Sequence, residues 1–475
     1  MSIKAAVELS QKLAWINADP QKIAEHKGRV VALVFWNATS VYCHNVLADM
    51  QQLQRKYQDK LSVLSIHLPK FSAELESKTV LEVLNRLDIQ LPVANDAQWI
   101  TWQHYDIQSW PSVVLIDDNG FVVGQFSGDN HKKDIESAVS ELVLAVKNTV
   151  PAKPKLLQAK PKSKSFSVLN SPCGLLIHKN LLYIADSGHN RVLECTIDGS
   201  VKRVFGNGLP LYLDGNSAEA SFNRPMGMSA SREYLYVADT GNHAIRRIRL
   251  LDGMIDSILG NGKPGFTQDC VVGVHSDVQL NNPSAVVVHQ DLLIVADSGN
   301  NCLSAFNLAN LHFSQLAGKG TLGLLDGVGT RSEMAHPLAL SGSKNHLFVA
   351  EGSSSSIRTV AIPEGRVNTI IGLGLYQYGK EDGMRKTAGL QHPSAVLVDE
   401  KNGLLWVADS YNHMVRSINL TTNTLSSYPL MQSLVNPSAL ALDQESLWIA
   451  DSASSQIHRY FFATEYLSRV SIQTA

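Results

Sequence analysis

The segment FWNATSVYCHN, residues 35–45, holds a serine and a cysteine at a spacing that thiol chemistry uses. Cys43 follows Ser40 by three residues, where an apolar run ends and a helix is predicted to begin. A helix N-terminus and a neighbouring hydroxyl both lower the pKa of a thiol. Thiol–disulfide exchange also needs a resolving thiol, and in a Cys-x-x-Cys pair the first cysteine is the exposed attacker. Serine occupies that position here, so dithiol oxidoreductase activity is not expected.

Two interpretations of Cys43 stay open. The first is a monothiol enzyme, because Ser40 and Cys43 resemble the peroxiredoxin arrangement, in which a hydroxyl three residues before the reactive cysteine bonds the thiolate and the peroxide. The proline that opens the peroxiredoxin signature would fall near Trp36 and is missing. In the second interpretation Cys43 is a small core residue beside Pro111, and burial raises the pKa of its thiol. The second is favoured. Under the first, the candidate catalytic residues are Cys43, Ser40 and Pro111.

Alternating strands and helices are predicted around this segment. Apolar, β-branched runs predict strands, and apolar residues at helical spacing predict helices. The expected elements are a surface helix in residues 1–22, a strand at 29–36, a helix at 44–57, a strand at 61–68, a hairpin at 112–128 and an amphipathic helix at 132–148. Asp118, Asn119 and Gly120 have the turn chemistry that the hairpin needs. This order predicts a small α/β sandwich.

Pro111 stands directly before the hairpin, in the dipeptide Trp110-Pro111. Proline donates no ladder hydrogen bond, so its place at the first residue of a strand needs a positional reason. Together with FWNATSVYC and the strand order, PVANDAQWITWQHYDIQSWPSVVLID (92–117) resembles the thioredoxin-like domain of the family of NHL repeat-containing protein two and its bacterial relatives. The resemblance covers residues 10–148. It implies a thioredoxin-like fold with a cis-proline at position 111.

One phrase recurs six times after residue 171, as in LLYIADSGHNRVLE (181–194): an apolar run that ends in alanine and an acidic residue. The acidic residues are Asp186, Asp239, Asp297, Glu351, Asp409 and Asp451, spaced by 53, 58, 54, 58 and 42 residues. A repeated unit with variable insertions is typical of a repeat architecture. Each copy reads as four short antiparallel strands, which make one propeller blade.

The acidic residues are interpreted as structural turn clips and not as catalysts. A short side chain after a buried strand can accept hydrogen bonds from the turn that follows. Gly188, Gly241 and Gly299 are expected to supply a positive φ to that turn, and Arg191 or Arg246 to bond back to the aspartate.

The repeated phrase resembles NHL repeats, from about residue 171 to 460, and six copies imply an all-β, six-bladed NHL-type propeller. Blade four has Glu351 and a serine run, so a looser turn is expected there. YLSRVSIQTA (466–475) is expected to form one more strand, which pairs with the first blade and closes the ring. Longer animal members of the family carry a further β-rich domain, which is expected to be absent here.

Composition and charge limit the remaining classes. Residues 151–165 are rich in lysine and proline, which predicts an extended linker at 149–166 between domains at 1–148 and 167–475. Five scattered cysteines and no apolar leader or membrane span predict a cytoplasmic protein. From residue 171 onward 22 Lys and Arg stand against 26 Asp and Glu, a net charge of −4 that disfavours nucleic-acid binding. The histidines show no ligand spacing, so no metal and no cofactor are predicted.

The function that these features favour is a cytoplasmic protein-interaction module. It would combine a rigid NHL propeller with a degenerate, Ser-x-x-Cys thioredoxin-like domain and bind an unidentified protein partner on one propeller face. Neither nucleic acid nor membrane is expected as a partner. The alternative is a monothiol redox enzyme, peroxidase-like or a thiol–disulfide oxidoreductase, that uses Cys43. Enzymatic activity is the less favoured of the two.

Overall fold

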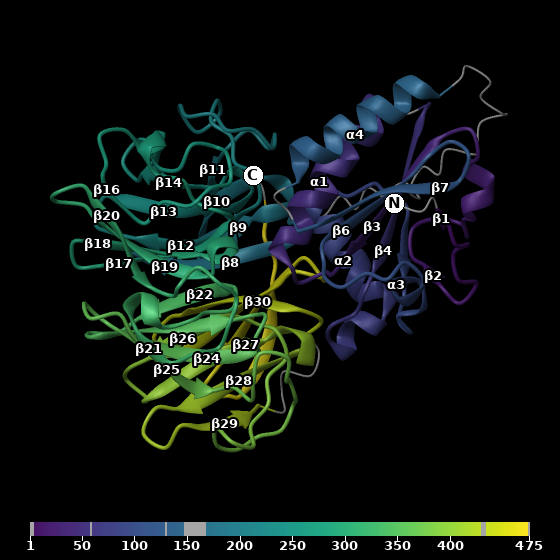
Figure 1. Ribbon diagram of the computed structural model, residues 1–475. Coiled ribbons are helices and arrows are strands. Elements are labelled where there is room, and N and C mark those ends of the chain that lie inside the picture. Colours follow the sequence, from purple (N-terminus) through teal and green to yellow (C-terminus); the bar gives the residue numbers. More distant parts are fainter. Residues whose placement is uncertain (1–3, 58, 129–130, 147–167, 429–433, 474–475) are drawn as a thin grey trace. The chain divides into compact units, whose positions relative to one another are not determined.

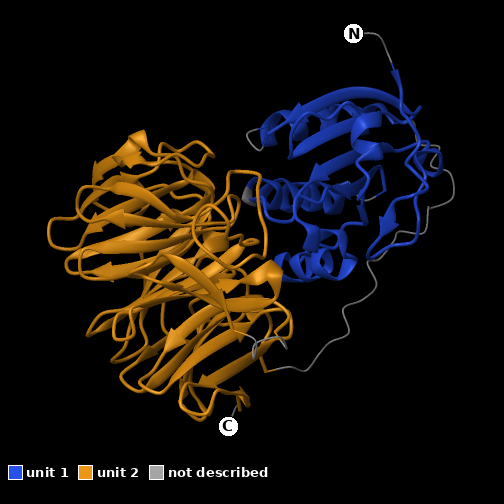
Figure 2. Ribbon diagram, turned by 90° about the horizontal axis from the view of Figure 1, so that it is seen from below, with its two compact units in different colours: residues 1–165 blue, residues 166–475 orange. Residues whose placement is uncertain are grey.

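The computed structural model describes the chain except residues 1–3, 58, 129–130, 147–167, 429–433 and 474–475 (Figure 1). Two compact units form, residues 1–165 and 166–475 (Figure 2). The predicted linker, 149–166, lies outside the described residues.

The first unit is built on a seven-stranded mixed sheet. Its strand order is β1 (Lys4–Ala5), β7 (Phe121–Ser127), β6 (Ser112–Ile116), β3 (Val30–Trp36), β4 (Leu61–His67), β5 (Val93–Asn95) and β2 (Ala14–Trp15). Strands β3, β4 and β5 run parallel, and β6 is antiparallel to β3. The helices are α1 (Val41–Lys56), α2 (Ser77–Leu87), α3 (Ile100–His104) and α4 (Lys132–Ala145), with short 3-10 helices η1 (Ile23–His26) and η2 (Ser72–Leu75).

Apolar side chains from both faces of this sheet are buried. On one face β3 and β4 pack with residues of α1, α2 and α4, and on the other with Leu9, Leu13, Ile23 and Tyr105. Strands β3 and β4 are buried along their whole length, which explains why their sequences are continuous apolar runs without alternation. This is the predicted thioredoxin-like sandwich.

The prediction of a surface helix in residues 1–22 is wrong. In the described part of that segment the chain instead forms β1 and β2, which occupy the two opposite edges of the sheet. Strand β1 pairs with β7 and β2 pairs with β5. Pairing with an open sheet edge satisfies backbone groups that would otherwise stay unpaired, and this tertiary gain outweighs a weak local helix propensity.

The second unit is a six-bladed β-propeller, as predicted. Blades one to three are β8 (Pro172–His178), β9 (Leu181–Asp186), β10 (Arg191–Thr196) and β11 (Val201–Phe205); β12 (Pro225–Ala230), β13 (Tyr234–Asp239), β14 (Ala244–Arg249) and β15 (Ile255–Leu259); and β17 (Pro283–His289), β18 (Leu292–Asp297), β19 (Cys302–Asn307) and β20 (His312–Ala317), with β16 (Asp269–Val271) on the edge.

Blades four to six follow the same plan. They are β22 (Pro337–Gly342), β23 (His346–Glu351), β24 (Ser356–Ala361) and β25 (Arg366–Ile371), with β21 (Gly327–Val328) on the edge; β26 (Pro393–Asp399), β27 (Leu404–Asp409), β28 (Met414–Asn419) and β29 (Thr424–Ser427); and β30 (Pro437–Leu442), β31 (Ser446–Asp451), β32 (Gln456–Phe461) and β33 (Tyr466–Val470). The first strand of each blade contacts the first strand of the next, and β30 contacts β8, so the blades form a closed ring.

The prediction that the C-terminal strand pairs with the first blade is wrong for residues 466–470. Strand β33 pairs along its whole length with β32 and is the outer strand of blade six. The first blade is reached only afterwards, where Gln473 makes hydrogen bonds of 2.9 and 3.0 Å to Val201 and Gly199. Ring closure rests as well on the Ser455 hydroxyl, which accepts the Ser171 N–H at 3.1 Å, and on a core shared by blades one and six.

The glycines of the blade turns have a different role from the predicted one. Gly188, Gly241 and Gly299 do not adopt positive φ; the left-handed residue is the last of each turn, such as Asn190 at φ 54° and His243 at φ 50°. A Cβ on Gly241 would lie 2.5 Å from the Asn223 side chain. The constraint is therefore close approach of two chain segments.

The turn of blade four is not looser than the others, contrary to expectation. Residues 353–356 are at most 4% exposed. The hydroxyls of Ser354 and Ser356 donate to the Glu351 carboxylate at 2.8 and 3.2 Å. The serine run thus provides the donors that asparagine provides in other blades, such as Asn242 to Asp239.

Candidate functional site

The segment that contains Ser40 and Cys43 lies where β3 ends and α1 begins. Ser40 is the residue before the first turn of α1, in an extended conformation. Cys43 is fully buried in the core between the sheet and α1. Its sulfur accepts the backbone N–H of Asn37 at 3.3 Å. The structure therefore brings the cysteine to the helix N-terminus, as the spacing indicates, but turns its thiol into the core.

Position 40 is not exposed, which corrects the view of it as an exposed attacking position. Ser40 is 6% exposed, and the preceding residues 37–39 are buried too. The ring of His44 closes the same turn, because its Nε2–H donates to the Ala38 carbonyl at 2.7 Å. A large disulfide substrate has no direct access to either position in this conformation.

Pro111 follows a cis peptide bond, as the resemblance implies, and is buried at the start of β6. Its carbonyl accepts the Gly128 N–H at 2.8 Å. Beside it three half-buried indoles form a cluster: the ring centroids of Trp99, Trp102 and Trp110 are 5.3 to 5.7 Å apart. Aromatic pairs at this separation contribute to stability beyond their buried area.

A buried polar network lies at the carboxyl ends of β3, β4 and β5, and the sequence did not indicate it. Its centre is Glu74 in η2, which is fully buried. The Glu74 Oε2 atom accepts the Asn37 amide at 2.9 Å and the backbone N–H groups of Lys70 and Phe71 at 2.6 and 3.1 Å. Burial raises the pKa of Glu74 to about 7. A glutamate inside the weakly patterned run LPKFSAEL gives no periodic signal by which to find it.

The network continues from Glu74 to a neutral histidine. Asn95 donates to the Glu74 carbonyl at 2.9 Å and pairs with His67 Nδ1 at 3.1 Å. Since the Asn95 amide nitrogen is already a donor, its oxygen accepts from His67 Nδ1–H. Burial lowers the pKa of His67 to about 4. Among the described residues, Glu74 Oε1, His67 Nε2 and Trp36 Nε1 are buried polar atoms without a hydrogen-bond partner.

In the propeller the six acidic residues are all at most 1% exposed. Five of them accept a backbone N–H group from just before the first strand of their own blade, as Asp239 does from Asn223 at 2.7 Å and Asp451 from Asn436 at 2.9 Å. Glu351 accepts from side chains instead. Each carboxylate faces its own blade and not a common cavity.

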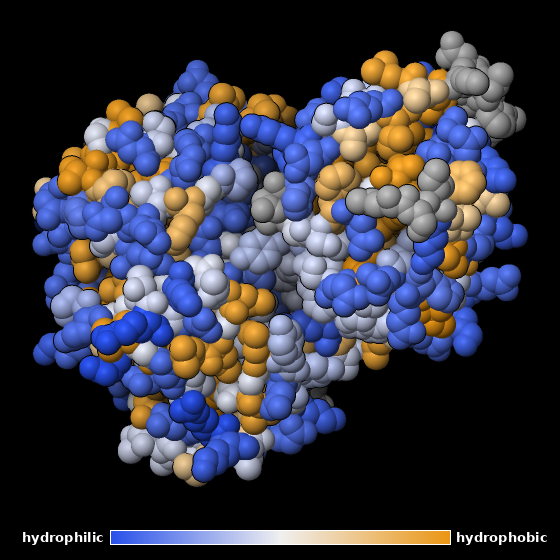
Figure 3. All heavy atoms as spheres, in the orientation of Figure 1, coloured by the Kyte–Doolittle hydropathy of each residue, from blue (hydrophilic) through white to orange (hydrophobic). Residues whose placement is uncertain are grey.

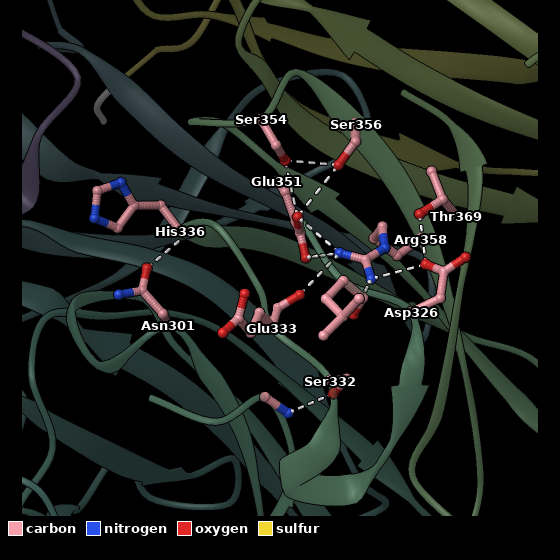
Figure 4. A network of polar contacts seen from close by, with 12 residues as sticks. Asn301, Asp326, Ser332, Glu333, His336, Glu351, Ser354, Ser356, Arg358 and Thr369 are labelled. Atoms are coloured by element: carbon pink, nitrogen blue, oxygen red, sulfur yellow. Dashed lines mark hydrogen bonds and ion pairs between the residues drawn. The ribbon is translucent and has the colours of Figure 1, made fainter. Parts of the chain in front are cut away.

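Blades two, four and five neutralise the carboxylate with a fully buried arginine seven residues later. Arg246, Arg358 and Arg416 approach Asp239, Glu351 and Asp409 at 2.9, 3.0 and 3.1 Å. Each guanidinium also binds a half-exposed aspartate of the preceding loop, as Figure 4 shows for Arg358 between Glu351 and Asp326. These loop aspartates, Asp214, Asp326 and Asp382, belong to the repeated Asp-Gly dipeptides. That dipeptide is the sequence feature that could have indicated the second carboxylate of each arginine site.

The other blades differ. In blade one Arg191 Nε donates to Asp186 at 2.8 Å, as expected. In blade three Ser304 stands where the arginine is in blade two, and Asp297 receives neutral donors from Asn281 and Asn300 at 2.7 Å. Burial raises the pKa of Asp297 to about 7. In blade five burial raises the pKa of Asp409 to about 6, although Arg416 opposes that effect.

The described residues contain no group of three or more His, Cys, Asp or Glu side chains placed to hold a metal ion. No helix in the described part of the chain is long and apolar enough to cross a membrane.

Known proteins match both parts of this architecture. A family model described as thioredoxin-like matches residues 28–122. NHL repeat-containing protein 2 of Bos taurus is 30% identical over 95% of this chain and 69% of its own length. The chain belongs to the family of NHL repeat-containing protein 2.

Two further relatives are similar over different parts. Protein SUPPRESSOR OF QUENCHING 1, chloroplastic, of Arabidopsis thaliana is 29% identical over 87% of this chain, which spans 41% of that relative. The thiol-disulfide oxidoreductase YkuV of Bacillus subtilis is 21% identical over 29% of this chain and 92% of its own length. Similarity to the Arabidopsis protein thus extends through both units, whereas similarity to YkuV covers less than a third of the chain.

Proposed function

We propose that this chain is a cytoplasmic protein-interaction module whose thioredoxin-like domain does not catalyse disulfide exchange. The observation that carries the proposal is the pair of positions at the start of α1. Serine stands where an attacking cysteine is needed, and Cys43 is fully buried in the apolar core. A buried thiol with serine at the attacking position lacks both requirements of the exchange reaction.

The propeller supports the binding role. Its loops between blades expose apolar side chains, namely Leu209, Leu211, Leu213, Leu322, Leu325 and Tyr376, which are 38 to 70% exposed. On the face in view in Figure 3, hydrophobic residues lie in separate patches among hydrophilic ones. Loops on a rigid ring are where propellers hold partners, and the six buried carboxylates are proposed to be part of that rigid framework.

A monothiol redox enzyme is the second candidate. The Asn37 N–H donates to Cys43 Sγ at 3.3 Å, and the cysteine lies in the first turn of α1. Both features stabilise a thiolate if the surrounding segment opens. The name of the Bacillus subtilis relative, a thiol-disulfide oxidoreductase, also favours this candidate.

A capture experiment separates the two. Affinity-purified full-length protein and its Cys43→Ser variant are compared on non-reducing gels, with Cys270→Ser as the control because Cys270 is the half-buried propeller cysteine. We expect the same partners for all three proteins and no adduct that depends on Cys43. A partner that is bound through Cys43 and released by reductant would instead establish the redox function.

A second experiment tests whether the exposed loop residues form the binding surface. Leu211→Asp and Leu325→Asp in one chain change two exposed loop residues and should abolish partner capture while leaving the unfolding midpoint within about one degree. Leu144→Asp is the matched control, since Leu144 is an 80% exposed residue in the other unit. Capture that survives the loop changes contradicts the proposed surface.

A further inference from the structure

The side chain of Asn37 holds the segment of residues 37–40 in place. Its amide nitrogen donates to the Leu68 carbonyl at 2.8 Å and to Glu74 Oε2 at 2.9 Å. Its amide oxygen accepts the backbone N–H and the hydroxyl of Thr39 at 3.0 and 2.7 Å. The backbone N–H of Asn37 donates to the sulfur of Cys43. Asn37 therefore links the cysteine directly to the buried carboxyl group of Glu74.

Glu74 is buried in a way that makes ionisation of its carboxyl group unfavourable. One oxygen accepts three hydrogen bonds, and the other is buried without a partner among the described residues. An ionised carboxylate with such a buried oxygen is unfavourable, because no protein donor compensates the charge on that atom and burial keeps the atom from bulk solvent. A protonated carboxyl group keeps the three acceptor bonds on the first oxygen and carries a hydrogen on the second.

We propose that Glu74 is the positioning residue of the segment 37–40 and that ionisation of its carboxyl group opens this segment and uncovers Cys43. The inference goes beyond the proposed function, because it concerns access to the thiol whether or not the thiol has a catalytic role. Opening places Glu74 in water, where its charge is solvated, and removes the Asn37 bonds that close the segment over the cysteine.

The sign of the pH dependence follows from the direction in which burial moves the pKa. Burial holds the pKa of Glu74 at about 7 in the closed segment, above the ordinary value of 4.5 that the exposed group regains. The closed form is therefore favoured at acidic pH and is weakened as the pH rises through this window, with no further change above about 7.

Other ionisable groups lie near Glu74, and the Glu74→Gln variant separates their titration from that of Glu74. Burial lowers the pKa of Lys70 to about 8, so it stays largely protonated below that pH and favours the ionised carboxylate. His67 of β4 has a pKa of about 4 and stays neutral. Asp96, at the end of β5, is occupied by the N–H groups of Ile100, Thr101 and Trp102.

The test is the rate at which a dipyridyl disulfide labels Cys43 in the full-length protein, read by peptide mass spectrometry. The rate at each pH is divided by that of the unfolded protein at the same pH, which removes the intrinsic chemistry of the thiol. Wild type is compared with Glu74→Gln, which cannot ionise, and with Glu76→Gln, an exposed neighbouring glutamate, as the matched control.

We expect the protection of wild-type Cys43 to fall at least about tenfold between pH 5 and pH 8, because the pKa of Glu74 differs between the closed and open forms and this difference sets the change in the opening equilibrium. Glu74→Gln should keep its protection at pH 8, and Glu76→Gln should behave like wild type. Equal or faster labelling of Glu74→Gln at pH 8 would overturn the proposal, because ionisation of Glu74 would then not be what uncovers the thiol. If Glu74→Gln does not fold, the wild-type profile decides, and protection that is independent of pH contradicts the proposal.

Discussion

Blades two and three have the same buried aspartate in the same turn but neutralise it differently. Asp239 contacts the guanidinium of Arg246, which also binds Asp214 of the preceding loop. Asp297 accepts its hydrogen bonds from neutral donors of blade three. The carboxylate in both blades accepts the N–H of a residue just before the first strand of its own blade. The acceptor role is therefore common to the two blades, and the counter-charge is a separate feature.

The loop before blade three differs together with the missing arginine. Where blade two has the loop aspartate at 214, blade three forms the edge strand β16, whose Asp269 points to solvent and pairs with His312 at 3.2 Å. Each buried arginine of blades two, four and five lies between two carboxylates, and blade three has neither the arginine nor the loop aspartate.

The largest expected effect is the loss of the arginine in blade two. Arg246→Met leaves Asp239 buried without a cation and should lower the free energy of unfolding by about 3 to 5 kcal/mol in urea at neutral pH. Arg247→Met is the control in the same strand, because Arg247 is 32% exposed and its pairing with Asp256 contributes less than about 1 kcal/mol. A loss below about 1 kcal/mol for Arg246→Met would show that the counter-charge is unimportant.

Asp297→Asn should make the propeller more stable at neutral pH, whereas replacing a buried polar group usually makes a protein less stable. The raised pKa of Asp297 means that ionisation costs stability as the pH increases from about 4 to about 7. Wild type should therefore lose roughly 2 to 4 kcal/mol relative to Asp297→Asn over that window, measured by unfolding at several pH values. Identical pH profiles for the two proteins would contradict the account of blade three.

A smaller effect is expected from the turn glycines. Gly241→Ala forces a Cβ to within 2.5 Å of the Asn223 side chain and should cost about 1 to 3 kcal/mol. Gly403→Ala is the contrast, because φ there is 64° while no atom lies within 4 Å of the added carbon. If only Gly403→Ala destabilises the propeller, backbone conformation and not close approach limits these positions.

The smallest expected signal is nucleic-acid binding. Arg247 and Arg249 form ion pairs with Asp256 and Asp252, and Arg246 is buried, so the arginine cluster of blade two offers little free charge. Fluorescence titration with single-stranded RNA near physiological salt should show no saturable binding, and Arg249→Ala should change nothing. Tight binding that weakens steeply with salt would contradict this expectation.

Most of the fold was predictable because its signals are local and repeated. The phrase that ends in Ala-Asp or Ala-Glu recurs six times and identifies the blades, and the apolar runs of β3 and β4 identify a doubly covered sheet. The first 22 residues were not predictable, because their pairing partners β5 and β7 are far away in the sequence. Strands β1 and β2 have 2 residues each and are too short to show an alternating pattern.

The candidate site was predictable in position but not in exposure. Spacing alone places Ser40 and Cys43 at a helix N-terminus and Pro111 before a strand. Burial of Ser40 depends on Asn37 and Glu74, which interact over 37 residues of sequence. A side-chain network of that kind has no sequence signature, so neither the inaccessible position 40 nor the buried carboxyl group could be foreseen.

We infer that Cys43 is a core residue and not an attacking thiol. This inference is tested most directly by the alkylation rate of Cys43 in the native protein as a function of pH, with Ser40→Ala alongside. We predict labelling that is slower than that of the unfolded protein at every pH, also after Glu74 has ionised, and that does not change in Ser40→Ala. Fast labelling near neutral pH that slows in Ser40→Ala would contradict the account and establish a reactive monothiol.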